Sequence, residues 1–340
     1  MIFVGDIACP EDKVDDFVSC VKKIDFFKDE IVVANCEGMF LNEKKRPKTL
    51  WNSDKTFIAF DNAKKVVVSL ANNHAYDYPS SIRYTVSKLE EQSIGVFGLS
   101  EDDKSILPYE FEDGGIKYAF FGHCWRLYTH TNKNNENKIS VTDCHYNSFI
   151  KLVGEYISRH SDTKVFCFMH WNYDLEFLPF PMHRRISRAL IDVGVEGVFG
   201  GHSHVPQGAE TYKGKPIVYG LGNFYLPSGI FFDGKLIYPK ESHVTYALRI
   251  NNGEHKIIWL CTDGDDKPLS IIGEEDFVSG SRIQSFSEFR FFDDKKYITF
   301  FKKNRRKKFL VPIFCEYSGL VYRIKETWAI MRVLLLRKIK

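Results

Sequence analysis

The chain has 340 residues, of which 44% are hydrophobic and 27% charged, a composition that excludes a largely disordered protein and can bury one large core. The net charge is only +3, although residues 301–340 carry 12 Lys or Arg against 2 Asp or Glu. The positive charge therefore lies in the C-terminal segment. No recognised nucleic-acid module accompanies it, so nucleic acid is not an expected partner.

The eight cysteines never form a C-x-x-C spacing, and several sit in apolar runs such as 165–168. This usage predicts buried or free thiols in a reducing compartment. The first residues lack the pattern of a signal peptide, and no stretch reaches the ~20 apolar residues of a spanning helix. These features predict a cytoplasmic protein, peripheral on the inner face of the membrane if its basic end binds there.

Short apolar runs rich in β-branched residues recur along the first two thirds of the chain and predict buried strands. In chain order these runs are Ile2–Val4, Ile31–Ala34, Val66–Leu70, Ile94–Phe97, Ile116–Phe121, Val165–Met169, Val195–Phe199 and Ile217–Tyr219. Helical spacing of apolar residues appears between them at Ser80–Gln92 and Met182–Val193. Alternating strands and helices predict an α/β domain.

The pattern changes after about residue 215. Val244–Ile250 and Lys256–Cys261 alternate in polarity and flank Asn251-Asn252-Gly253, which predicts a hairpin added antiparallel to the sheet. Asp263–Asp266 is a plausible boundary. The sequence thus predicts a catalytic domain at 1–265, followed by a polar linker and a basic amphipathic extension at 266–340.

Side chains of the metal-ligand type follow five of the predicted strands. They are Asp6, then Asn35 and Glu37, then Asn72, Asn73 and His74, then His170, then His202 and His204. Ligands of an open α/β sheet collect at the carboxyl ends of its strands, so these groups can converge. Imidazole, carboxylate and amide ligands together suit zinc, manganese or iron.

Each piece has a plainer reading. Gly5-Asp6 and the segment 35–38 are also typical of turns, and His170 of a core histidine. The pair His202 and His204 points more strongly to a metal, because alternate residues of extended backbone face the same side and Gly200-Gly201 permits close approach. Ligand-type residues after five strands of the same chain are better explained by one metal centre than by five unrelated turns or core residues.

The motifs as a set resemble the capsule-synthesis protein CapA family, a branch of the calcineurin-like metallophosphoesterases. They are Gly5-Asp6-Ile7, Asn35-x-Glu37-Gly38, Leu70-Ala71-Asn72-Asn73-His74-Ala75-x-Asp77-Tyr78, His170-Trp171, Gly201-His202-Ser203-His204-Val205-x-Gln207-Gly208 and Tyr219-Gly220-Leu221-Gly222-Asn223-Phe224. The match covers about residues 1–225. The resemblance implies a four-layer α/β/β/α sandwich with two divalent transition metals (Mn, Zn or Fe) at the sheet edge.

The resemblance also implies a role for each matching residue. The metal ligands are Asp6, Glu37, Asn73, His170, His202 and His204. His74, oriented by Asp77, is the acid that protonates the leaving group, although Asp77 is equally well read as a helix N-cap. Asn72, Trp171 and Asn223, together with Arg46, are expected to bind substrate.

The sequence departs from the wider phosphoesterase pattern at one place, a loss that CapA-like sequences generally share, and from the family at two. Ala8 stands where the wider phosphoesterase pattern has a histidine, so one metal is expected to be held less tightly. Asn172, Tyr173 and Asp174 follow His170-Trp171, where the family usually has Gly and then an acid. Gly201 stands where another histidine often precedes the H-x-H pair.

The leading hypothesis is a metal-dependent hydrolase of the phosphoesterase type, acting on an anionic polymer or phosphorylated glycan of capsule synthesis. The alternatives are an amide or ester hydrolase on a polyglutamate-like polymer and a non-catalytic polymer-binding or scaffold subunit. Arg46, Lys48, Arg126, Arg184 and Arg185 are expected near the rim, either binding an anion or simply solvated.

The C-terminal segment has two readings. Residues 302–308 are basic, and Leu320–Lys340 mixes Lys and Arg with Trp, Ile, Val and Leu. One reading is a solvated basic run followed by an ordinary packing helix. The other is an interfacial helix, which would bind an anionic membrane surface through residues 302–340.

Overall fold

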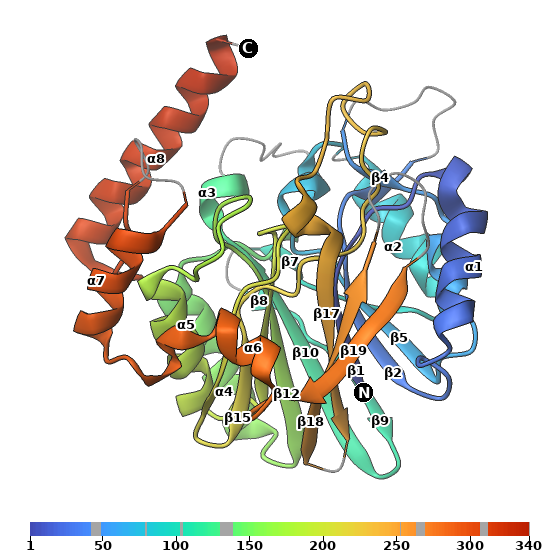
Figure 1. Ribbon diagram of the computed structural model, residues 1–340, viewed down its shortest axis with the longest axis horizontal. Helices are drawn as coiled ribbons and strands as arrows, with labels where there is room; N and C mark the ends of the chain where they lie inside the picture. Colours follow the sequence, from blue (N-terminus) through green and yellow to red (C-terminus); the bar gives the residue numbers. More distant parts are fainter. Residues whose placement is uncertain are drawn as a thin grey trace.

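The computed structural model describes residues 1–41, 49–78, 80–102, 105–129, 139–251, 253–262, 269–306 and 312–339. Two sheets lie face to face, and helices cover the outer side of each (Figure 1). The predicted α/β class is therefore confirmed.

The larger sheet has eight strands in the described part of the chain. Its order is β19-β18-β17-β1-β2-β5-β6, with β16 also paired to β1. Strands β1, β2, β5 and β6 are parallel, as expected for strands joined by crossovers, and β17 joins β1 antiparallel. The bounds are β1 Ile2–Ile7, β2 Ile31–Cys36, β5 Lys65–Ser69, β6 Gly95–Phe97, β16 Asn223–Tyr225, β17 Val244–Asn251, β18 Glu254–Cys261 and β19 Ser270–Asp276.

The second sheet has six strands among the described residues, in the order β14-β15-β13-β12-β10-β9. Its strands β10, β12, β13 and β15 are parallel. The bounds are β9 Tyr109–Asp113, β10 Ile116–Cys124, β12 Thr163–His170, β13 Gly197–Gly201, β14 Ala209–Tyr212 and β15 Lys215–Val218. Short strands pair beside the sheets: β3 Met39–Phe40 with β4 Trp51–Asn52, and β7 Leu99–Asp102 with β8 Ser105–Ile106 and β11 Ser140–Val141.

Helices pack on the outer faces because the strands alternate apolar side chains between two cores. In β1, for example, Val4 faces the core under helices α1 (Val14–Ile24) and α2 (Ser81–Glu91), whereas Phe3 stacks on Phe199 between the sheets. The second sheet is covered by α4 (Tyr146–Arg159) and α5 (Pro181–Asp192). The remaining helical elements are α3 Arg126–Thr129, α6 Ser281–Phe286, α7 Asp294–Asn304, α8 Gly319–Ile339, η1 Glu11–Lys13, η2 Thr56–Phe60, η3 Asn73–Tyr76, η4 Lys240–His243 and η5 Glu288–Phe291.

One segment ties the two sheets together. After β15, residues 219–223 cross from the second sheet to the larger one. Leu221 N donates to Gly200 O of β13 in the second sheet (2.9 Å), and Asp6 N of β1 in the larger sheet donates to Gly222 O (3.0 Å). A Cβ on Gly200 would lie 2.0 Å from Tyr219 O, and one on Gly5 would lie 1.8 Å from Gly222 O. Glycine is therefore required at both positions for this close approach.

All eight predicted strands and both predicted helices are present, with ends shifted by a few residues, and the predicted hairpin is β17 and β18. The predicted polar linker after residue 265 is wrong in part. Strand β19 extends the larger sheet, and Phe277 and Ile283 enter the core between the sheets. Residues 263–268, with the whole of the predicted boundary Asp263–Asp266, lie outside the described residues.

The C-terminal helices also pack on the domain. Tyr297 and Phe301 of α7 and Tyr322 and Ala329 of α8 join the core beneath the second sheet. The last turns of α8 extend beyond the domain (Figure 1). Among the described residues, none of the helices combines the length and the apolar character needed to cross a membrane.

Candidate metal centre

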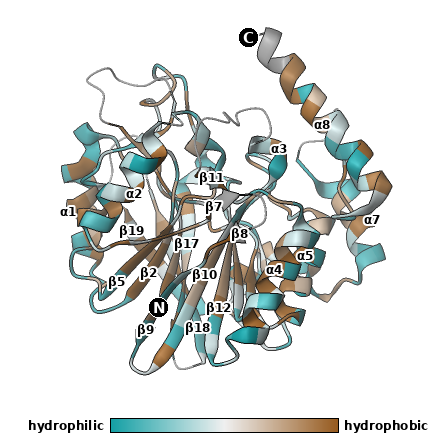
Figure 2. Ribbon diagram, turned by 180° about the vertical axis from the view of Figure 1, so that it is seen from behind, coloured by the Kyte–Doolittle hydropathy of each residue, from teal (hydrophilic) through white to brown (hydrophobic). Residues whose placement is uncertain are grey.

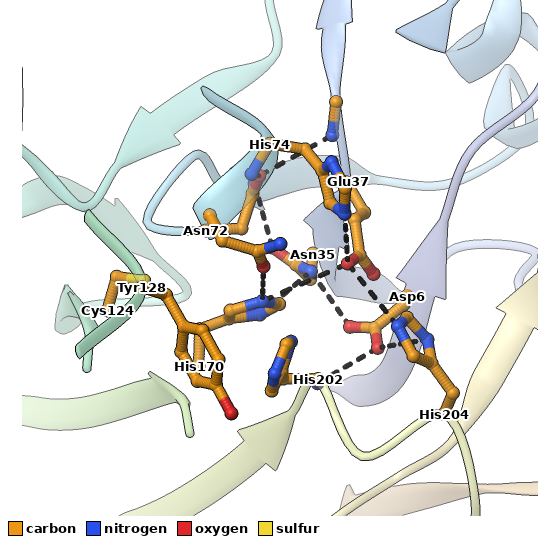
Figure 3. Close-up of polar contacts among 12 residues, drawn as sticks. Asp6, Asn35, Glu37, Asn72, His74, Cys124, Tyr128, His170, His202 and His204 are labelled. Carbon is orange, nitrogen blue, oxygen red and sulfur yellow. Dashed lines mark hydrogen bonds and ion pairs between the residues drawn. The ribbon is translucent and has the colours of Figure 1, made fainter. Parts of the chain in front are cut away.

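The predicted ligands converge at one edge of the two sheets (Figure 3). Asp6 near the end of β1 is level with Asn35 of β2, and His170 at the end of β12 is level with Gly201 of β13. Glu37 follows β2, Asn73 begins η3 after β5, and His202 and His204 follow β13. The larger sheet thus supplies mainly oxygen ligands, and the second sheet supplies the three imidazoles.

Glu37 lies at the centre of the site. Its side chain is fully buried, and neither carboxylate oxygen has a hydrogen-bond partner among the described residues. Three imidazole nitrogens surround its Oε1 atom: His74 Nε2 and His170 Nε2 at 3.9 Å and His204 Nε2 at 3.8 Å. A buried carboxylate without a partner is costly, so this arrangement calls for a cation.

The spacing of the side chains fits metal ions. Two ligand atoms that are each ~2.1 Å from one ion lie ~3–3.5 Å apart, slightly closer than these pairs. Ligand atoms of Glu37, His170 and His202 lie within 4.8 Å of one another, and so do those of Asp6, Glu37 and His204. Glu37 belongs to both groups, whereas His202 and His204 belong to different ones. The residues present therefore fit a metal centre.

Asp6 is held by neighbouring polar groups. Its Oδ1 atom accepts a hydrogen bond from Asn35 Nδ2 (2.8 Å), and its Oδ2 atom accepts one from the His202 backbone N–H (3.0 Å). His204 Nδ1 lies 3.6 Å from the same Oδ2 atom. Asp6 therefore links the larger sheet to the loop that carries both histidines.

The histidine rings are oriented by side-chain amides. Asn223 Oδ1 lies 2.8 Å from His204 Nδ1; an amide oxygen can only accept, so the Nε2 lone pair of His204 faces Glu37. Asn73 Oδ1 lies 2.7 Å from His170 Nε2, so these two predicted ligands face the same point. Asn223, predicted to bind substrate, instead orients a predicted ligand.

The loop after β13 has strained backbone. His202 has a φ of 81° and His204 a φ of 54°, in the left-handed region that non-glycine residues rarely adopt. Such conformations cost about 1–3 kcal/mol each and concentrate at functional sites. The fold therefore holds both imidazoles in place at a cost in stability.

Burial shifts the pKa of His170 toward the form that binds metal and the pKa of Glu37 toward the protonated form, which a bound cation would reverse. Burial lowers the pKa of His170 well below its usual value, and the neighbouring His202, His204 and His74 lower it further, so its ring is neutral at neutral pH. Neutral imidazole is the form that binds metal. Burial, followed by the charge of Asp6, raises the pKa of Glu37 well above its usual value.

His74 and Asp77 form a hydrogen-bonded pair at the edge of the site. His74 Nδ1 lies 2.6 Å from Asp77 Oδ2, and the opposite nitrogen faces Glu37. Both side chains retain some exposure, 15% for His74 and 16% for Asp77. This geometry suits a proton donor held by a carboxylate, the arrangement that the resemblance implied.

Asp174 is a functional candidate that the sequence reasoning noted only as a departure. Its Oδ1 atom lies 3.1 Å from His202 Nε2, and it forms a third potential metal group with His202 and His204. Asn172, two residues before Asp174, has a φ of 75°, in the left-handed region that glycine adopts most readily. Asn is the side chain that best tolerates this backbone conformation.

The other two departures have local causes. A Cβ on Gly201 would lie 2.6 Å from Asp6 Oδ1, so a histidine cannot replace it without moving Asp6. Ala8 is fully buried among Leu50, Leu226, Phe231 and Tyr238, which fill the space around it. Tyr238 also packs on His204, with ring centroids 5.2 Å apart.

Two residues predicted to bind substrate lie beneath the site, and a third lies outside the described residues. Asn72 is fully buried, donates to Cys36 O (2.8 Å) and caps η3 by accepting from His74 N. Trp171 is fully buried and donates to Tyr219 O (2.9 Å). Burial leaves neither side chain a surface for substrate, which corrects that prediction. Arg46 and Lys48 belong to the segment 42–48, outside the described residues.

The expected basic rim is wrong at two positions. Arg184 is buried and pairs with Glu210, donating from Nη2 (2.9 Å) and Nε (3.2 Å). Arg185 pairs with Asp294 (2.8 Å) and Glu316 in the C-terminal part of the chain. Arg126 Nη1 lies 3.1 Å from His145 Nε2, in an exposed contact. The places of these arginine side chains are set by partners that lie far from them in the sequence.

The chain was compared with known proteins. Two curated relatives are the capsule biosynthesis protein CapA of Bacillus anthracis, 27% identical over 62% of this chain and 51% of that protein, and the PGA biosynthesis protein CapA of Bacillus subtilis, 28% identical over 48% and 43%. A probable polyglutamine synthesis accessory protein of Mycobacterium tuberculosis is 40% identical over 16% of this chain and 14% of its own. The chain spans about half the length, or less, of the curated relatives it matches.

Solved structures show distant similarity. The calcineurin-like phosphoesterase YfkN from Bacillus subtilis is 10% identical, with a TM-score of 0.36 over 84% of this chain and 90% of that one. The NAD nucleotidase NadN from Haemophilus influenzae is 14% identical, with a TM-score of 0.36 over 77% and 43%. Values this low carry no functional argument. The family profile of the bacterial capsule synthesis protein PGA_cap, in contrast, matches residues 1–228, and the chain belongs to that family.

Proposed function

We propose that this chain is a metal-dependent hydrolase of the phosphoesterase type that acts on an anionic polymer or phosphorylated glycan during capsule synthesis. The observation that carries the proposal is Glu37, a buried carboxylate without a hydrogen bond, which three imidazole nitrogens approach to 3.8–3.9 Å. A protein that only binds polymer has no evident need for this costly arrangement.

Two metal ions fit the ligand set better than one. Glu37 would be shared, His170 and His202 would complete one site, and Asp6 and His204 would complete the other. Asn73 would add an amide oxygen beside His170. Divalent ions held there supply Lewis acidity and lower the pKa of water. The protein itself holds the ligands, excludes bulk water and places His74 beside them.

His74 has the position of a general acid. Its Nε2 atom faces the centre of the site, and Asp77 holds the ring through the other nitrogen. In this position it can give a proton to a departing oxygen. A binding or scaffold subunit does not require such a donor, so the pair favours an enzyme.

The cavity beside His74 indicates how a polymer would enter. It has a volume of about 190 Å³ and is lined by Asn73, His74, Asp77, Tyr128 and Phe232, among others. Pockets for drug-sized ligands are ~300–1,000 Å³. The cavity therefore suits one terminal or side group better than a whole polymer unit.

An amide or ester hydrolase on a polyglutamate-like polymer is the second candidate. It is supported by the name of the Bacillus subtilis relative, which refers to PGA biosynthesis. The same metal chemistry attacks carbonyl carbon as well as phosphorus. The two functions differ in the substrate and not in the ligand set.

The test is turnover by the full chain after reconstitution with Mn, Zn or Fe. The substrates are bis-p-nitrophenyl phosphate, p-nitrophenyl phosphate and poly-γ-glutamate, each with and without chelator. We expect metal-dependent hydrolysis of a phosphate ester by the wild type and none by Glu37→Gln. Cleavage of poly-γ-glutamate alone would establish the second candidate. Binding of metal and polymer without any turnover would show a scaffold subunit and refute both hydrolase proposals.

A further inference from the structure

Helix α8 exposes a continuous apolar stripe. Leu320, Val321, Ile324, Trp328, Met331 and Leu335 are 74%, 60%, 60%, 38%, 51% and 62% exposed. Their spacing of three and four residues places them along one side of the helix. Tyr322, Glu326 and Ala329 lie on the other side and are buried against the domain. Hydrophobic stretches alternate with hydrophilic ones along the part of α8 that extends beyond the edge of the domain (Figure 2).

Cations border this stripe. Residues 319–340 contain six Lys or Arg and one acid, Glu326. At 100° per residue, Arg323 falls on one border of the stripe and Arg332 on the other. Glu326 points inward, where it accepts a hydrogen bond from Tyr322 (2.7 Å). The outward side of α8 therefore combines large apolar side chains with positive charge only, as far as its side chains are described.

We propose that α8 binds the surface of an anionic lipid bilayer, with its axis in the plane of the membrane. An apolar stripe bordered by Lys and Arg is the pattern by which interfacial helices insert between anionic headgroups. An exposed stripe of this length has no role in a helix surrounded by water.

A second copy of the chain is a poorer partner for the stripe. Packing two stripes together would bring the Arg323 and Arg332 borders of both helices close to each other. Facing acids would be needed to offset this charge, and the helix has only the buried Glu326. Charge thus favours an anionic surface over self-association.

The same helix reaches the candidate active site. Val333 lines the cavity that also contains His74 and Asp77. A bilayer bound by α8 would therefore lie near the entrance for substrate, and the substrate would be a polymer presented at the membrane. This consequence rests on the proposed function, whereas binding to lipid needs neither metal nor turnover.

The test is co-sedimentation of the full chain with phosphatidylcholine vesicles that contain or lack phosphatidylglycerol. The wild type should bind only the anionic vesicles, less so at high salt. Each cation near an anionic surface contributes ~1 kcal/mol, equal to about fivefold in partitioning. Arg323→Gln combined with Arg332→Gln should therefore lower partitioning about 25-fold, and Ile324→Glu should abolish it.

Matched variants elsewhere control for general changes of surface. Phe291→Glu alters an apolar side chain that is 79% exposed, and Lys151→Gln removes a cation that is 76% exposed; both should bind like the wild type. Thermal melts verify that every variant folds. If Ile324→Glu does not fold, the double variant Arg323→Gln with Arg332→Gln still tests whether α8 binds the anionic vesicles.

Three outcomes would overturn the proposal. They are no binding to anionic vesicles at low salt, equal binding to neutral vesicles, and equal loss in the control variants. Light scattering is run in parallel without lipid. A dimer that Ile324→Glu dissociates, in a protein that does not bind vesicles, would show that a second copy covers the stripe. If the wild-type protein binds anionic vesicles but shows no turnover, the proposed function is refuted and the proposal of lipid binding stands.

Discussion

Replacing Glu37 by glutamine should stabilise the protein that has been stripped of metal. The substitution keeps the shape of the side chain but removes a charge that is fully buried without a hydrogen bond. A buried polar group without a partner costs about 1–3 kcal/mol, a cost that glutamine keeps, whereas a charged group costs more, and this excess is what the substitution removes. We therefore expect Glu37→Gln to raise the free energy of unfolding in chelator by about 1–3 kcal/mol.

The corresponding change in melting temperature is measurable. The entropy of unfolding is ~2.1 cal/mol/K per residue, or ~0.7 kcal/mol/K for a chain of 340 residues. The variant should then melt about 1–4 °C above the wild type in chelator. With metal at 100 times its Kd, one site would stabilise the wild type by about 2.7 kcal/mol. The variant lacks the shared ligand and should gain less, so its advantage over the wild type should shrink in metal.

The stability difference between Glu37→Gln and the wild type in chelator should depend on pH, because the pKa of Glu37 is raised. A carboxyl group whose pKa is raised by folding holds its proton more tightly in the folded state. Without metal, the wild type therefore loses stability as the pH rises from the unfolded value of about 4.3 through the folded one. Glu37→Gln lacks this loss, so its advantage should be larger at pH 8 than at pH 5.

The assay is thermal melting of both proteins in chelator and in excess Mn or Zn. Glu210→Gln is the matched control, because Glu210 is also buried but accepts hydrogen bonds from Arg184, Arg188 and Tyr219. Breaking this buried pair should destabilise the protein by about 3–5 kcal/mol under both conditions. The reasoning fails if Glu37→Gln melts below the wild type in chelator, or if metal stabilises both proteins equally.

Three further predictions concern the site and the ion pair behind it. Purified protein supplemented with Mn or Zn should carry about two equivalents of metal by elemental analysis, and His202→Ala and His204→Ala should each lose one; protein that stays metal-free contradicts the centre. His74→Ala should lower turnover by ~10²-fold on substrates with poor leaving groups, and less on activated esters, with metal content unchanged; equal losses on both substrates argue against a general acid. Burial raises the pKa of Glu210, but the hydrogen bond and charge of Arg184, with the charge of Arg188 and the hydrogen bond of Tyr219, together lower it. The stability from this pair should be present above about pH 4.3 and lost as the pH falls through the lowered value, so the penalty of Glu210→Gln in urea unfolding should shrink below pH 4.

The positions of the ligands could be predicted because each one follows an apolar run that only a buried strand explains. Asp6 after Ile2–Val4 and His170 after Val165–Met169 are examples. Parallel strands bring their carboxyl ends to one edge of the sheet, so the convergence of these residues follows from the strand order without any measured distance between them. The sequence therefore indicated which residues lie together, although it did not show that Glu37 stands at their centre.

Other features depend on contacts that no local pattern reveals. Strand β19 was missed because most of its side chains are exposed, and an edge strand of that kind has no apolar run. Arg184 seemed to be a rim cation because its partner, Glu210, lies 26 residues further along the chain. Asp174 was visible as an acid, but its distance to His202 depends on the left-handed turn at Asn172.

The crossing segment at residues 219–223 limits how this protein can diversify. It binds the backbone beside Asp6 on one sheet and beside His202 on the other, through glycines that no larger residue can replace. The two halves of the site therefore cannot hinge apart to admit a larger substrate. Substrate specificity can therefore change mainly through the loops around the cavity. A designer who wishes to change specificity should graft or lengthen those loops and leave the crossing segment untouched.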